Sequence, residues 1–272
     1  MRGRVLIIAG SDSGGGAGVQ ADIKSVSALG GFAATAISAL TAQNSLGVHS
    51  IYPVATDFIK EQMKVVLDDI GADCLKIGML HNADVIDAVS AVIKDRAKNI
   101  PLVADPVMVA KGGASLLDES AHSAMITKIL PLATLLTPNA PEASVLSGIK
   151  VVDVDSQQVA GETLLKKGAR AVLVKGGHIS GSNITDLLVT KNGVFRFESK
   201  RILTQHTHGT GCTLASGIAT GLAQGMDLYR AVSRARSYLS AAIITAPGFG
   251  SGHGPINHTV TVDLKKSITK YT

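Results

Sequence analysis

Cys212 is one of only two cysteines in this chain of 272 residues, and it stands in the stretch His-Gly-Thr-Gly-Cys-Thr ahead of an apolar segment. Backbone N–H groups at the start of a helix attract anions, and the helix dipole adds to this attraction. The same field favours a thiolate over a thiol. The stretch therefore predicts either a reactive thiol beside an anion site or a small buried side chain, and both interpretations stay open.

A glycine-rich stretch follows the first apolar run, Gly-Ser-Asp-Ser-Gly-Gly-Gly-Ala-Gly-Val-Gln-Ala-Asp from residue 10 to 22. Gly16, Gly18 and Ala21 have the spacing of a dinucleotide fingerprint. The second apolar run ends without the acidic residue that would hold a ribose, which argues against a nicotinamide cofactor. A Walker A loop is excluded because no Gly-Lys dipeptide occurs. The stretch either surrounds a small polar ligand or is a tight turn in which Asp12 or Ser13 caps a helix.

Polar residues follow three other apolar runs. Asn139 and Glu142 have the spacing of a helix capping box, and their oxygens are also suited to Mg²⁺. Lys175, followed by two glycines, is either a solvated side chain or a partner for a phosphate. Asp105, before a proline, is either a turn residue or a ligand for a metal.

The elements that position these residues follow from alternating short apolar runs and longer amphipathic segments. We expect strands at 5–9, 32–39, 74–77, 102–104, 133–136 and 171–174, helices at 17–29, 56–70, 84–98, 120–129, 211–224 and 228–246, and a hairpin of 187–190 with 194–197. This alternation predicts a mostly parallel sheet covered on both faces, within one domain. In such sheets ligands bind beyond the carboxyl ends of the strands, where the polar residues above occur.

Composition narrows the classes of function. The net charge is +5, and no run of Lys and Arg is interleaved with aromatic residues, so we expect no nucleic-acid partner. The long stretch 25–56 lacks charge but is broken by glycines and a proline, so we expect no membrane span. Two distant cysteines predict a reducing, cytoplasmic compartment. His206 and His208 have the spacing of a zinc pair on a strand, but no further ligands at fitting spacing support it.

The motifs together, in this order, resemble the ribokinase-like superfamily, and more closely the hydroxymethylpyrimidine/phosphomethylpyrimidine kinases. The stretches that carry the resemblance are G-S-D-S-G-G-G-A-G-V-Q-A-D, A-L-T-A-Q-N, K-I-G-M-L, D-P-V-M, T-P-N-A-P-E-A, V-K-G-G-H and H-G-T-G-C-T. The resemblance implies a three-layer α/β/α sandwich with a mostly parallel central sheet, a single ribokinase-like kinase domain over 1–272, and a homodimer that uses ATP and Mg²⁺.

The resemblance also implies a reaction. ATP would phosphorylate 4-amino-5-hydroxymethyl-2-methylpyrimidine and then its monophosphate. A cysteine at position 212, where sugar kinases carry an aspartate, argues against a sugar substrate. The implied roles are Gly209, Thr210, Gly211 and Cys212 at the transferring phosphoryl group, with Cys212 taking the substrate proton; Lys175 and Asn139 at the nucleotide; Asp105 and Glu142 at Mg²⁺; and Gln43, Gly10, Ala17, Asp22, Met79 and Val107 at the pyrimidine.

For two of these residues, Gln43 and Asp22, the residue type itself bears on what the resemblance implies. The Gln43 amide offers a donor and an acceptor, as the edge of an aminopyrimidine does. Without the resemblance, Asp22 is as well explained as a helix-surface residue.

Three other functions stay open. The first is a pyridoxal or pyridoxine kinase of the same superfamily. The second is an acyl-transfer enzyme in which Cys212 is the nucleophile and His206 or His208 its base. The third is a nucleotide-binding regulator without turnover. The run 48–54 is a candidate for the segment that shields the site from water.

Overall fold

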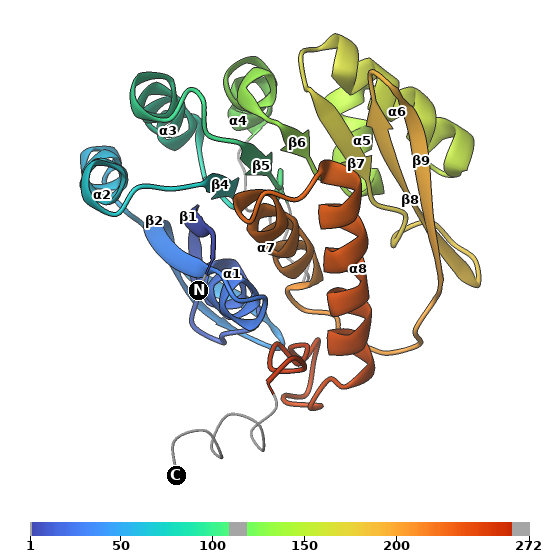
Figure 1. Cartoon of the computed structure of the whole chain (residues 1–272). Helices are drawn as coiled ribbons and strands as arrows, with labels where there is room; N and C mark the ends of the chain where they lie inside the picture. The colour runs from blue at the N-terminus through green and yellow to red at the C-terminus, as the bar shows by residue number, and fades with distance from the viewer. Residues whose placement is uncertain (1, 109–118, 263–272) are drawn as a thin grey trace.

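A single sheet runs through the part of the chain that the computed structural model describes, residues 2–108 and 119–262 (Figure 1). Its strands are β1 Arg4–Asp12, β2 Phe32–Asn44, β3 Gly47–Pro53, β4 Cys74–Ile77, β5 Leu102–Ala104, β6 Leu135–Leu136, β7 Ala171–Val174, β8 Asn183–Thr190 and β9 Gly193–Lys200. Their spatial order is β3-β2-β1-β4-β5-β6-β7-β8-β9. The strands between β2 and β7 run parallel, whereas β3, β8 and β9 pair antiparallel with their neighbours.

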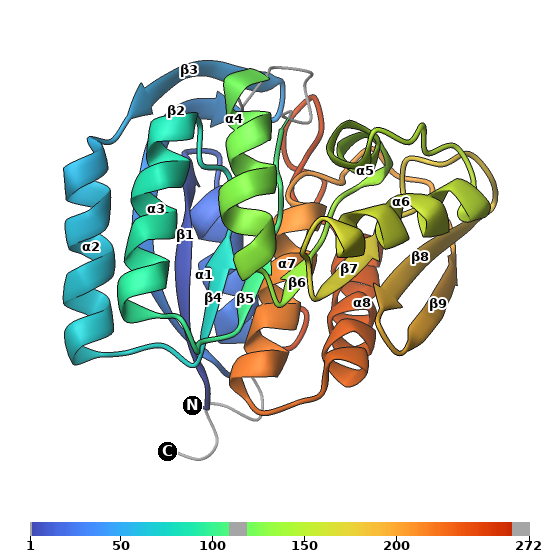
Figure 2. The same cartoon turned by 90° about the horizontal axis from the view of Figure 1, so that it is seen from above.

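Helices cover both faces of this sheet (Figures 1 and 2). They are α1 Gly18–Ala28, α2 Thr56–Asp69, α3 Ala83–Arg96, α4 Glu119–Ala124, α5 Ala140–Ser147, α6 Val154–Lys166, α7 Thr210–Ala223 and α8 Leu228–Ile244. Alternate side chains of β1 enter the two layers: Val5 and Ile7 pack with α1, α7 and α8, while Leu6 and Ile8 pack with α2 to α6. The expected three-layer sandwich with a mostly parallel sheet is confirmed.

The first two strands extend beyond the apolar runs that predict them. β1 continues through Ser11 and Asp12, which pair with Leu40 and Thr41 of β2 after a register shift. This extension carries polar residues of both strands past the core in parallel. It therefore places the beginning of the glycine-rich loop beside the end of β2.

Other parts of the chain differ from the expected elements. The sequence pattern does not predict β3, which takes up most of the 48–54 run, or α6. The helix expected at 120–129 begins as α4 and continues as a π-helical turn, Met125–Ile129. The capping box at the start of α5 is confirmed in both of its hydrogen bonds. Within residues 2–108 and 119–262, no helix combines the length and the apolar character needed to cross a membrane.

The carboxyl ends of the parallel strands meet at one edge, and polar side chains follow them there. Asp12 ends β1, Asp105 follows β5, Thr137 follows β6 and Lys175 follows β7. The first turn of α7 reaches the same edge, since a Cβ on Gly211 would lie 3.3 Å from Oδ2 of Asp105 and 3.5 Å from Nζ of Lys175. Segments far apart in the sequence thus converge on one place.

Candidate active site

A cavity of about 1150 Å³ opens at this edge, and all the expected site residues except Asp22 line it. It is lined by Gly10, Ala17, Gln43, Met79, Asp105, Val107, Asn139, Glu142, Lys175, Gly209, Thr210, Gly211 and Cys212. Its volume is enough for a nucleotide-sized ligand and a smaller one together. Motifs that are spread over most of the sequence therefore contribute residues to one cavity.

The start of α7 forms one wall of the cavity. Gly209, the N-cap residue, has φ 81°, and no side chain caps the helix. A Cβ at this position would overlap the carbonyl oxygen of Gly16, so only glycine lets the turn approach the first loop so closely. The backbone N–H groups that begin the helix face the cavity without a side-chain acceptor. They form a site for an anion.

The thiol of Cys212 opens into this cavity but is surrounded by protein. Burial raises the pKa of Cys212 to about 12, and the nearby Lys76 ammonium offsets this effect only in part. Of the two interpretations that the sequence leaves open, a thiol with a lowered pKa does not hold for the ligand-free protein. Removal from water is the largest influence on this group, which is a neutral thiol near pH 7.

A buried ion pair adjoins the cavity. Nζ of Lys76 lies 2.7 and 2.9 Å from the two carboxylate oxygens of Asp22, and Ser216 of α7 donates to the same carboxylate at 2.7 Å. Burial opposes the charge on Lys76, but Asp22 and other acidic neighbours outweigh it and raise the pKa of Lys76. The helix-surface alternative for Asp22 is wrong, because the residue is fully buried.

Lys76 lines the cavity, and the sequence reasoning assigned it no role. The signal was present, since a lysine stands inside the apolar strand Cys-Leu-Lys-Ile and a lysine there needs a buried partner.

Lys175 and Asp105 form a second ion pair, which lies in the cavity wall. Their Nζ and Oδ1 atoms are 2.9 Å apart, and the hydroxyl of Thr137 donates to the same oxygen at 2.9 Å. Burial opposes the charge on Lys175, but Asp105 and Glu142 outweigh it and raise the pKa of the ammonium. Lys175 is thus a fixed positive charge beside the start of α7.

The capping box of α5 carries the third acidic group. Asn139 Oδ1 accepts from the Glu142 backbone N–H at 2.9 Å, and Glu142 Oε2 accepts from the Asn139 N–H at 2.8 Å. Burial raises the pKa of Glu142 to about 7; Lys175 opposes this shift and Asp105 adds to it. The residue is a structural cap and also a carboxyl that titrates near neutral pH in the cavity wall.

The carboxylates expected at Mg²⁺ both lie in the cavity wall. Asp105 and Glu142 supply two carboxylates to one cavity, with Lys175 beside them. In the described ranges, no cluster of three or more His, Cys, Asp or Glu side chains is arranged to hold a metal, and this includes the His206–His208 pair. Mg²⁺ commonly binds one or two carboxylates together with water and phosphate oxygens. The donor set fits such an ion when a nucleotide is bound.

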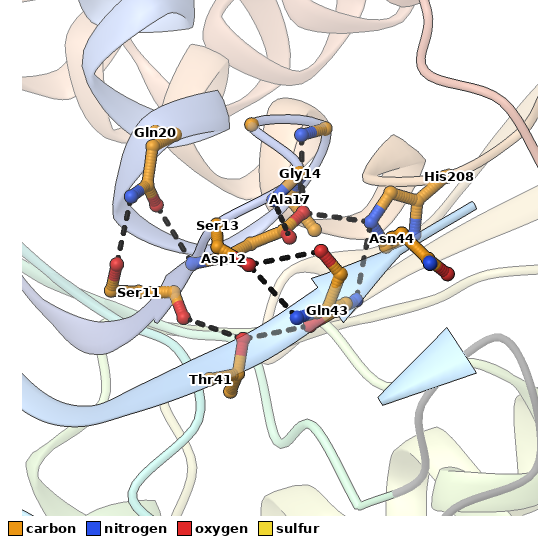
Figure 3. A network of polar contacts seen from close by, with 12 residues as sticks. Ser11, Asp12, Ser13, Gly14, Ala17, Gln20, Thr41, Gln43, Asn44 and His208 are labelled. Carbon is orange, nitrogen blue, oxygen red and sulfur yellow. Dashed lines mark hydrogen bonds and ion pairs between the residues drawn. The ribbon is translucent and has the colours of Figure 1, made fainter. Parts of the chain in front are cut away.

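A polar network joins the first loop, the end of β2 and the start of α7 (Figure 3). Oδ1 of Asp12 accepts from the Gly14 N–H, and its Oδ2 accepts from the N–H groups of Gly16 and Ala17. The expectation that Asp12 or Ser13 caps α1 is therefore wrong: Ala17 is the N-cap residue, no side chain caps this helix, and Asp12 instead holds the loop in its turn.

His208 and Gln43 belong to the same network (Figure 3). Nε2 of His208 lies 2.8 Å from Oδ2 of Asp12 and 3.3 Å from the amide nitrogen of Gln43. Burial favours a raised pKa for Asp12, but hydrogen bonds from His208 and the loop lower it instead. Nε2 of His208 is hydrogen-bonded to Asp12. His208 is therefore not arranged as the base of an acyl-transfer enzyme in which Cys212 is the nucleophile.

Comparisons with known proteins identify the family of the chain. Residues 12–257 match the profile of the family described as phosphomethylpyrimidine kinase. The chain is 47% identical over 259 residues to the hydroxymethylpyrimidine/phosphomethylpyrimidine kinase of Haemophilus influenzae, with 94% of this chain and 96% of that protein covered. It is 48% identical over 262 residues to the thiamine biosynthesis bifunctional protein ThiED of Geobacter sulfurreducens; this covers 96% of the chain but only 53% of that longer protein.

The fold is likewise similar to a solved structure. An ADP complex of Bacillus subtilis pyridoxal kinase superimposes with a TM-score of 0.88 at 33% sequence identity, covering 96% of this chain and 98% of that one. The expected ribokinase-like architecture is confirmed by this likeness.

Proposed function

The chain belongs to the phosphomethylpyrimidine kinase family, and from this premise we propose that it phosphorylates 4-amino-5-hydroxymethyl-2-methylpyrimidine with ATP and then phosphorylates the monophosphate. One observation carries the proposal. The uncapped start of α7, the Lys175 ammonium and the Gln43 amide all line a single cavity. An anion site, a fixed cation and a group that can recognise a pyrimidine edge are what this transfer requires.

In the first transfer, the oxygen of the substrate hydroxymethyl group forms a bond to the γ-phosphorus, and the bond from that phosphorus to the bridging oxygen of ADP breaks. The N–H groups of Gly211 and Cys212 stabilise the transferring phosphoryl oxygens, and Lys175 neutralises charge on the nucleotide. Cys212 first gives up its own proton to solvent as the substrates bind, and the resulting thiolate accepts the hydrogen bond of the substrate hydroxyl and takes its proton. The nearby Lys76 ammonium favours the thiolate that this step needs.

The second transfer differs in its acceptor. The attacking atom is then a phosphate oxygen that already carries negative charge, so no proton has to be removed from it. The chain therefore needs a proton acceptor in the first transfer only.

Asp105 and Glu142, with Asn139 beside them, would hold Mg²⁺ through water, and the ion would neutralise charge on the phosphates when bound. For the pyrimidine, we propose contacts with backbone groups near Gly10 and Ala17 and with the apolar side chains of Met79 and Val107 as walls for the flat ring. Asp22 lies one layer deeper and would act on the substrate only through Lys76. A cytoplasmic location and a homodimer are part of the same proposal.

The test is steady-state ADP production from Mg-ATP with the aminopyrimidine alcohol, its monophosphate, and pyridoxal in parallel reactions. We expect turnover with the first two and a kcat/KM for pyridoxal at least about tenfold lower. A Lys175→Met variant serves as the inactive control. No ADP with either pyrimidine would contradict the proposal.

Pyridoxal kinase is the second candidate, and the observation in its favour is the likeness to the Bacillus subtilis enzyme. A higher kcat/KM for pyridoxal than for the pyrimidine would support it.

A further inference from the structure

In the network of Figure 3, the side-chain amide of Gln43 is oriented so that a hydrogen-bond donor faces another donor. Nε2 of His208 lies 2.8 Å from a carboxylate oxygen of Asp12, and a carboxylate only accepts. The Nε2 atom must therefore carry a proton and donate it. The Gln43 amide nitrogen, 3.3 Å from the same Nε2, is also a donor, so two donors face each other.

At the opposite end of the Gln43 amide, one hydrogen-bond acceptor faces another. The Thr41 hydroxyl lies 2.9 Å from the carbonyl oxygen of Ser11 and 3.1 Å from the amide oxygen of Gln43. A hydroxyl has one proton to donate, and a carbonyl oxygen can only accept. When that proton is given to Ser11, the hydroxyl oxygen faces the Gln43 oxygen as one acceptor against another.

A half-turn of the amide about its last bond exchanges oxygen and nitrogen without changing its outline. His208 then donates to the amide oxygen as well as to Asp12, and the amide NH₂ group donates to Thr41. Both conflicts become hydrogen bonds. We propose that His208, held by Asp12, is a positioning residue that fixes the amide of Gln43 with its oxygen toward His208 and its NH₂ group toward Thr41.

This orientation decides what the cavity recognises, and here the inference rests on the proposed function. Gln43 lines the cavity, and each end of its amide keeps one unused hydrogen-bonding position. The oxygen is then a fixed acceptor and the NH₂ group a fixed donor. A 4-aminopyrimidine offers the complementary pair, an exocyclic N–H donor beside a ring-nitrogen acceptor. The 4-oxo analogue offers the reverse pair, a carbonyl acceptor beside a ring N–H donor.

The experiment compares the two compounds as substrates and as ligands. We expect wild-type protein to favour the 4-amino compound over the 4-oxo analogue in kcat/KM by about 10² or more. In His208→Leu and in Thr41→Val one end of the amide is released, so the ratio falls by about tenfold or more. Thr41→Ser keeps the hydroxyl and should keep the ratio within about twofold. His206→Asn changes a neighbouring histidine outside the network and serves as a further control.

A direct observation separates this inference from the proposed function. In ¹H–¹⁵N NMR spectra of the ligand-free protein we expect the His208 ring proton on Nε2, whether or not the protein turns over any pyrimidine. A bare Nε2 overturns the inference. So does an unchanged selectivity ratio in Thr41→Val, whose isosteric side chain preserves packing. Absence of pyrimidine turnover by wild-type protein, with Nε2 protonated and calorimetry showing selective binding of the 4-amino compound, would overturn only the proposed function.

Discussion

The Cys212 side chain lies in the cavity wall, and burial makes it a neutral thiol in the ligand-free protein. We predict that Cys212→Ala keeps nucleotide affinity and slows the first phosphorylation by about 10²-fold or more, because the hydroxyl then lacks its proton acceptor. The second phosphorylation, whose acceptor is already anionic, should change far less. Separate rate measurements with the alcohol and the monophosphate check this, and equal slowing of both would assign Cys212 to packing.

Titration of Glu142 should make the affinity for Mg-nucleotide depend on pH. Its pKa of about 7 means that the carboxyl is neutral below this pH and charged above it. We predict that affinity for Mg-nucleotide rises between pH 6 and 8, and that Glu142→Gln, which can still accept the Asn139 hydrogen bond, removes most of the rise. Calorimetric titrations at several pH values measure it. Because the folded pKa is raised, Glu142 also makes folding less favourable as pH rises from about 4.5 to about 7.

The residues that sequence could predict are those in motifs that end a strand. Asp105 and Lys175 follow apolar runs directly, and the rule for parallel sheets places them together. Lys76 was missed because its partner Asp22, and Ser216 which donates to Asp22, come from two helices distant in sequence. A lysine inside an apolar strand indicates a buried partner, but which residue is that partner depends on contacts between elements.

Two glycines at the start of α7 are needed for different reasons: Gly209 for folding and Gly211 for catalysis. We predict that Gly209→Ala loses more than about 2 kcal/mol of stability, because φ is positive and the new Cβ would overlap the Gly16 carbonyl. Gly211→Ala should instead fold with unchanged or higher stability, since alanine is the better helix former. Its Cβ would enter the space between Asp105 and Lys175, so turnover should fall by about tenfold or more. Thermal unfolding and turnover of the two variants decide this, and the reverse pattern would contradict it.

The buried pair of Lys76 and Asp22 ties β4 to α1, and Ser216 adds α7. We predict that Lys76→Met costs about 3–5 kcal/mol, because it leaves a buried carboxylate without a counter-charge. The double variant Lys76→Met/Asp22→Asn should recover part of this loss. Urea unfolding of wild-type protein, the two single variants and the double variant forms a complete cycle. Additive losses would show that the two side chains do not depend on each other.

Elements were predictable where apolar periodicity was strong. The central strands are short apolar runs, and their positions follow from the sequence within a few residues. Helix α6 was missed because it carries few apolar residues and contains Gly161, which allows close packing against Val189 of β8. Strand β3 was missed because it is a half-exposed edge strand without a clear apolar pattern. Its strand conformation depends on pairing with β2.

At the scale of the whole molecule, the cavity joins loops from both ends of the chain, so ligands should stabilise the entire fold. We predict that a non-hydrolysable Mg-ATP analogue together with the aminopyrimidine, each near a hundredfold excess over its Kd, raises Tm by about 5 °C or more. Thermal scans with each ligand alone and with both measure it. A Lys175→Met control should lose most of the nucleotide's share. No shift with either ligand would argue against binding in this cavity.

Strand β1 is made first, yet α7, which covers it and also packs on β4 and β5, lies some two hundred residues later. At ordinary rates of translation that interval lasts on the order of ten to forty seconds. During this time the ribosome-bound chain exposes Val5, Ile7 and Cys74 on an unfinished apolar surface. The last quarter of the sequence therefore completes both the active cavity and the cover of β1. A prematurely terminated chain should associate with chaperones or aggregate rather than persist as a smaller folded unit.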